Sequence, residues 1–89
     1  MQTTKYYLFS FRSRTEAMQL HYALSASAIK SAVVNTPRPL GVGCSLSVRV
    51  ESQSLLIAQE ILKNHDFSTF LGGFYVENNG YNLKTLRLL

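Results

Sequence analysis

An aromatic strand segment passes directly into a helix start near residue 12, and this junction restricts how the chain can fold. The segment at residues 5–11 is short and rich in Tyr and Phe, which is typical of a strand buried on at least one face. Ser13 and Glu16 then have the spacing of a capping box, with the serine at the N-cap and the glutamate at the third helical position. Apolar residues recur at helical spacing without Gly or Pro, so we expect a helix over residues 14–28.

The rest of the chain alternates between strand and helix patterns. We expect strands at residues 31–36, 45–51 and 74–77, a helix from Ser52 or Ser54 to residues 64–66, a connector at 67–73 and a turn at 78–80. Within residues 45–51 every second residue is Leu or Val, the pattern of a half-buried strand. The preceding strand ends before Pro37, because proline cannot donate to a strand ladder. Residues 37–44 contain two prolines and two glycines and therefore predict a loop.

The predicted element order is β-α-β-β-α-β followed by a tail, and it indicates an α+β fold of the ferredoxin-like, split-βαβ class. We expect an antiparallel sheet with two helices on one face, in a single domain over residues 1–89 with a core at about 4–78. Residues 79–89 would form a turn and a C-terminal extension, in which Tyr81–Leu89 is apolar enough to add a fifth strand or form an interface. Right-handed crossovers place three connections at one end of the sheet, residues 11–15, 37–44 and 64–70.

Composition excludes several classes of protein. With 46% hydrophobic and 16% charged residues, the 89-residue chain is not expected to be disordered. Its net charge of +4 is modest for a nucleic-acid-binding tail. No apolar stretch approaches the length of a membrane span, and no signal peptide is recognisable at the N-terminus. We therefore expect a cytoplasmic protein without nucleic-acid or membrane partners.

Cys44 is the leading candidate for chemistry, because it follows a Pro/Gly loop at the crowded end of the sheet. Gly43 allows close backbone approach, and Arg38 lies in the same loop. We expect the N-terminus of the first helix at this end too, bringing a partial positive charge and a plausible anion site. The candidate anion-binding residues there are Arg12, Ser13, Arg14 and Thr15. Such surroundings favour a thiolate nucleophile. The alternative is a cysteine that packs as a small apolar residue.

The other candidate chemistries rest on less. His65 follows the second helix and could approach Cys44 as in a cysteine enzyme, but a histidine there also suits a helix C-terminal cap. His21 lies among apolar neighbours without a second ligand at metal-binding spacing, so we expect no metal and no cofactor. RNA-recognition modules share the element order, but they carry stacking aromatics on the third strand, and residues 45–51 hold none.

Two segments carry a resemblance to a known family. Residues 36–49, Thr-Pro-Arg-Pro-Leu-Gly-Val-Gly-Cys-Ser-Leu-Ser-Val-Arg, resemble the loop of the selenium/sulfur carrier-like family, in which a Pro-Arg pair and a Gly-Cys pair precede an alternating strand. Residues 8–17 resemble that family's first strand end and helix start. The resemblance implies that Cys44 is the proposed carrier of a sulfur or selenium atom, with Arg38 and the turn at Ser13 and Thr15 around it. The family often has glycine after the cysteine, where this chain has Ser45.

Two functions from different classes remain open on the sequence. The first is a carrier that holds a persulfide or selenopersulfide on Cys44, with a donor enzyme and an acceptor protein as partners. The second is a small regulatory or interaction module that dimerises through its C-terminal segment or binds a small ligand, without chemistry at Cys44. Under either function, we expect a carrier or binding domain rather than an enzyme.

Overall fold

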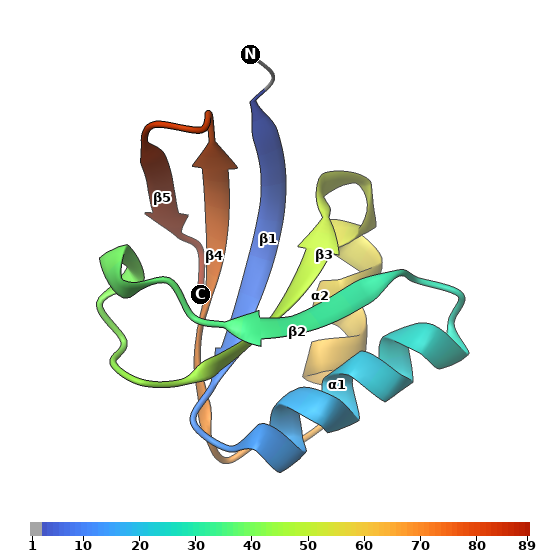
Figure 1. Ribbon diagram of the computed structural model, residues 1–89. Helices are drawn as coiled ribbons and strands as arrows, with labels where there is room; N and C mark the ends of the chain where they lie inside the picture. The colour runs from blue at the N-terminus through green and yellow to red at the C-terminus, as the bar shows by residue number, and fades with distance from the viewer. Residues whose placement is uncertain (1–2) are drawn as a thin grey trace.

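The computed structural model describes residues 3–89 and shows a five-stranded antiparallel sheet with two helices packed on one face (Figure 1). The elements are β1 (Thr4–Phe11), α1 (Arg14–Ala26), β2 (Ser31–Asn35), β3 (Leu46–Glu51), α2 (Leu55–Lys63), β4 (Phe70–Asn78) and β5 (Leu83–Arg87), with short 3-10 turns η1 (Arg38–Leu40) and η2 (Ser52–Ser54). The strand order is β2-β3-β1-β4-β5, and every neighbouring pair is antiparallel. The predicted α+β, ferredoxin-like arrangement is confirmed, with β5 added at one edge.

Both faces of the sheet are covered, by different parts of the chain. On one face α1 and α2 contribute Ala17, Leu20, Leu24, Ala58 and Leu62 to a core shared with the sheet. On the other face, Leu40 from η1 packs into a second cluster with residues of β1 and β4, and Val42 and Leu83 lie against it. Figure 1 shows the segment between β2 and β3 on the side of the sheet away from the helices. The predicted loop is therefore also a cover for the core.

Helix α1 ends at Ala26, two residues before the predicted end. Ala28 has a φ of 61°, in the left-handed region, and the amide of Ile29 donates to the carbonyl oxygen of Leu24 at 2.9 Å. This is the pattern that commonly closes a helix, but the left-handed position usually holds glycine. The apolar spacing continues past the last helical turn and therefore predicts a longer helix. The actual end depends on a left-handed backbone angle that alanine rarely adopts, so the sequence does not signal it.

Strand β4 begins at Phe70, so the predicted connector at residues 67–73 is wrong over its second half. Gly72 and Gly73 both lie inside the strand. A Cβ atom on Gly72 would lie 3.2 Å from the carbonyl oxygen of Leu89, and one on Gly73 would lie 3.2 Å from the Leu89 side chain. The two glycines therefore make room for the C-terminal residues.

The C-terminal segment completes the sheet within the same chain. Strand β5 pairs with β4, and the amides of Leu88 and Leu89 both donate to the carbonyl oxygen of Gly73. The guanidinium of Arg87 donates to the carbonyl oxygen of Leu71 at 2.7 Å. Of the two roles expected for the tail, the structure shows the extra strand.

Over residues 3–89, no helix has the length and apolar character needed to cross a membrane.

The left-handed backbone at Ala28 generates a stability prediction. We expect Ala28→Gly to raise the free energy of unfolding by roughly 0.5–1 kcal/mol, because the cost of this conformation exceeds the entropic advantage of alanine. Thermal denaturation should then show a Tm about 2–8 °C higher. The control is Gln19→Gly in the middle of α1, where glycine should lower stability by roughly 0.5–1 kcal/mol. An Ala28→Gly variant less stable than the parent would contradict the left-handed assignment.

Candidate functional site

Three connections meet at one end of the sheet, as the topology predicts. In the sheet register Phe11 pairs with Leu46 on one side and Phe70 on the other, and Asn35 pairs with Leu46. The ends of β1 and β2 therefore lie beside the starts of β3 and β4. The connections then separate, because α1 and the segment before β4 pack on the helix side, whereas residues 36–45 turn onto the opposite face.

Cys44 is exposed and lies in a pocket of about 380 Å³ at the end of the loop. The pocket is lined by Asn35, Thr36, Arg38, Gly43, Cys44 and Ser45. The structure thus brings together three of the sequence candidates, Arg38, Gly43 and Cys44. The exposure of the thiol differs from the alternative interpretation, in which it packs as a small apolar residue. A reagent or a partner can reach this thiol directly.

The base of the loop is closed by hydrogen bonds between its two ends. The amide of Thr36 donates to the carbonyl oxygen of Ser45 at 3.1 Å, and the Ser45 hydroxyl donates to Thr36 Oγ1 at 2.8 Å. Thr36 Oγ1 lies 2.6 Å from Ser47 Oγ, which lies 2.7 Å from Ser10 Oγ. A continuous chain of four hydroxyls therefore leads from the pocket into the sheet. Buried networks of this kind are rigid when every member is paired.

Sequence reasoning missed this hydroxyl chain, because Ser47 falls on the polar positions of an alternating strand. In the structure Ser10 and Ser47 are fully buried beneath the loop. One signal was present in the sequence: the polar positions near the loop are small hydroxyl residues, whereas Arg49 and Glu51 farther along the strand are charged. Small uncharged polar side chains can be buried when they are hydrogen-bonded, which charged ones rarely achieve.

The apex of the loop packs against the sheet, whereas Gly43 and Cys44 near its end are exposed to solvent. Leu40 is buried against the second core, and Val42 is half-buried beside it. Gly41 and Gly43 have φ angles of 71° and 77°, values that a side chain would strain. Gly41 is the C-cap of η1, and Cys44 directly follows Gly43. The position of the thiol is set by its anchored neighbours.

The start of α1 is occupied by contacts with the segment before β4. Ser13 accepts a hydrogen bond from the Glu16 amide at 3.3 Å, which confirms the predicted N-cap. The other half of the predicted capping box is not formed, because the Glu16 carboxylate turns to a different segment. The Glu16 carboxylate accepts hydrogen bonds from the amides and hydroxyls of Ser68 and Thr69. The backbone amide of Ser13 donates to Thr69 Oγ1 at 3.1 Å. The glutamate thus joins the helix start to the β4 approach.

The predicted anion-binding residues Arg12, Ser13, Arg14 and Thr15 do not line the Cys44 pocket in the part of the chain that the structure describes. Arg12, Arg14 and Thr15 are exposed, and Ser13 serves as the helix cap. Their participation in chemistry at Cys44 stays a prediction. Arg38 is the cation that the structure places at the pocket.

Both histidines have partners away from the thiol. His65 Nδ1 donates to the carbonyl oxygen of Ile61 at 2.9 Å, and its ring stacks on Phe67 with the centroids 5.3 Å apart. Phe67 packs on the helix-side core. Because His65 bonds a carbonyl of the last turn of α2, next to the C-cap Asn64, it helps to close that end of the helix. His21 Nδ1 lies 2.6 Å from the Ser31 hydroxyl, as suits a packing residue. Within residues 3–89, no group of three His, Cys, Asp or Glu side chains is placed to hold a metal ion.

The fold and site together define a small ferredoxin-like domain that presents an exposed thiol in a loop pocket. A family model described as "Putative Se/S carrier protein-like" matches residues 6–70, which is more than half of the chain. The chain therefore belongs to this family, in agreement with the resemblance seen in the sequence. The match includes the whole loop and its pocket, and β5 lies beyond it. Searches of the curated proteins and of the solved structures returned no significant match.

The contacts of Glu16 generate a pH prediction. Hydrogen bonds from the hydroxyl and amide of Thr69, with those from Ser68, hold the pKa of Glu16 below its ordinary value of 4.5. A carboxyl whose pKa is lower in the folded state stabilises the protein fully above its unfolded pKa, and this contribution is lost as the pH falls through the folded pKa. The Tm difference between the parent and Glu16→Gln should therefore shrink between pH 6 and pH 3.

The matched control for this measurement is Glu60→Gln, which alters an exposed carboxylate on α2. Its Tm difference from the parent should change much less over the same range. A Tm difference for Glu16→Gln that stays constant with pH would contradict the assignment of these hydrogen bonds to the ionised carboxylate.

Proposed function

We propose that this protein carries a sulfur or selenium atom as a persulfide or selenopersulfide on Cys44. The observation that supports the proposal most is the exposed thiol in the loop pocket beside Arg38, inside the segment that matches the carrier-like family. A carrier needs a thiol that two partners can reach in turn. It also needs a fixed position for that thiol, which the anchored loop provides.

The loading step is an exchange between sulfur atoms. The Cys44 thiolate attacks the terminal sulfur of a donor persulfide, and a new bond forms between Cys44 Sγ and that sulfur. The sulfur–sulfur bond of the donor breaks, and the donor leaves as a thiolate with the bonding electron pair. The proton on the terminal sulfur moves with it, so no net oxidation occurs. Delivery to an acceptor follows the same exchange, and neither a metal nor a cofactor takes part.

The pocket residues suit an anionic terminal sulfur or selenium atom. The guanidinium of Arg38 supplies positive charge, and the amide of Asn35 supplies a neutral donor at the same pocket. A water molecule occupies about 30 Å³ of the liquid, and a chalcogen atom is of similar size. A pocket of about 380 Å³ therefore has room for the carried atom and for the end of the donor group. The proposed partners are a donor enzyme and an acceptor protein.

The carrier function predicts a defined mass change on loading. After incubation with cysteine persulfide, intact mass spectrometry should show one added sulfur atom per chain, and none in Cys44→Ser. The second candidate function, a binding module without chemistry at Cys44, predicts no adduct. Absence of the adduct from the folded parent protein would overturn the carrier proposal.

A pair of arginine variants tests which charge assists loading. Arg38→Gln should slow loading about 1.4- to fivefold, because a partly screened charge near the reacting anion contributes roughly 0.2–1 kcal/mol. Arg14→Gln removes the same charge at the start of α1, outside the residues that line the pocket. Slower loading in Arg14→Gln but not in Arg38→Gln would show that the helix start, as the sequence predicts, provides the anion site.

A further inference from the structure

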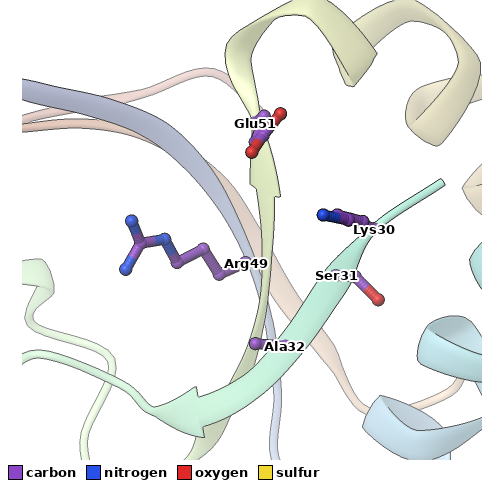
Figure 2. Close-up of a pocket in the computed structure, with 5 residues that line it drawn as sticks. All are labelled: Lys30, Ser31, Ala32, Arg49 and Glu51. Atoms are coloured by element: carbon purple, nitrogen blue, oxygen red, sulfur yellow. The ribbon is translucent and has the colours of Figure 1, made fainter.

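The pocket at Cys44 differs from a hollow over the paired strands β2 and β3 in where its polar groups point. The charged side chains of that hollow diverge: Figure 2 shows Arg49 directed away from Lys30, and the Arg49 guanidinium lies 4.1 Å from the centre of the Tyr6 ring. The Cys44 pocket, in contrast, is reached by the chain of four hydroxyls, because Thr36 and Ser45 both line it. The order of the protons along that chain decides what the pocket can bind.

The proton order is set at the buried end of the hydroxyl chain. Ser10 is fully buried, and within residues 3–89 the one hydrogen-bond partner of its hydroxyl is Ser47 Oγ, at 2.7 Å. If Ser47 donated to Ser10, the Ser10 proton would be buried without an acceptor, an arrangement that folded proteins avoid because of its cost. Ser10 therefore donates to Ser47.

Thr36 then accepts two hydrogen bonds and keeps its own proton free. Because Ser47 accepts from Ser10, the single proton of its hydroxyl is directed to Thr36 Oγ1, at 2.6 Å. The Ser45 hydroxyl also donates to Thr36 Oγ1, at 2.8 Å. Both lone pairs of that oxygen are thus occupied, and among the described residues the Thr36 proton has no acceptor. A ligand in the Cys44 pocket, which Thr36 lines, would supply one.

We propose that the Thr36 hydroxyl donates a hydrogen bond to the anionic sulfur or selenium atom carried on Cys44. This inference rests on the carrier function proposed above and names a residue that recognises the carried atom. The terminal sulfur of a persulfide stands about 2 Å beyond Cys44 Sγ, and Thr36 and Arg38 both line the pocket around that cysteine. A hydroxyl that accepts hydrogen bonds is a stronger donor, because neighbouring bonds in a chain polarise one another. Ser47 and Ser10 are positioning residues, since they act through Thr36.

A persulfide made chemically on Cys44 tests the role of Thr36 without a donor enzyme. Cys44 is first converted to its mixed disulfide with 5-thio-2-nitrobenzoate, and hydrosulfide then attacks Cys44 Sγ. A new sulfur–sulfur bond forms as the nitrobenzoate thiolate leaves with the electron pair of the broken bond. The rate at which iodoacetamide alkylates the terminal sulfur, followed by intact mass spectrometry against pH, reports the ionised fraction of that sulfur.

Thr36→Val should raise the pH midpoint of this alkylation by about one unit, because a hydrogen bond to the ionised sulfur favours the charged form. Thr36→Ser keeps the hydroxyl and should restore most of that difference. Thr85→Val removes an exposed hydroxyl from β5 and should leave the midpoint unchanged. A midpoint in Thr36→Val equal to that of the parent would overturn the inference.

Ser47→Ala distinguishes the two possible proton orders. Thr36 keeps its proton in this variant but loses one polarising bond, so the midpoint should rise by at most about 0.3 unit. If Thr36 donated to Ser47 instead, the variant would free the Thr36 proton for the pocket, and a lowered midpoint would overturn the inference. Thermal denaturation shows whether each variant is folded. Because the persulfide is made without a donor, a parent protein that fails to load from cysteine persulfide but shows the Thr36→Val shift would contradict the carrier function and not the role of Thr36.

Discussion

The burial of β1 on both of its faces is the constraint on which the rest of the structure depends. Leu8 points into one core and Phe9 and Phe11 into the other, and all three are almost completely buried. Each such side chain contributes about 1.5–3 kcal/mol when it is removed from water. Both helices pack on one face, so another part of the chain must cover the second. Residues 36–45 do so, and the position of Cys44 follows from this requirement.

The loop combines a fixed position with an accessible thiol. Leu40 holds its apex in the second core, and the hydrogen bonds between Thr36 and Ser45 close its base. Between these two attachments, Gly43 and Cys44 remain exposed. A covalent carrier depends on this combination, since a buried thiol could not be reached and a mobile one would be presented without defined surroundings. The family match extends over both attachments and the exposed residues between them.

The two faces of the sheet therefore differ in what they do. On the helix face, Glu16, His65 and His21 all have structural partners, and groups that looked chemical in the sequence serve to cap or join elements. The pocket at Cys44 belongs to the side of the sheet that the helices leave free. The carrier function is proposed on this face, because a single loop covers it and leaves Cys44 accessible to solvent.

The element order, the Ser13 cap and the meeting of three connections at one end of the sheet could all be predicted from the amino-acid sequence. These depend on periodicity and capping between residues a few positions apart. Three-dimensional packing was needed to show that Ser47 is buried, that Gly72 and Gly73 lie in a strand, and that the start of α1 does not line the Cys44 pocket. These features arise where segments distant in the sequence come into contact, and no local pattern specifies which segment covers the free face of a sheet.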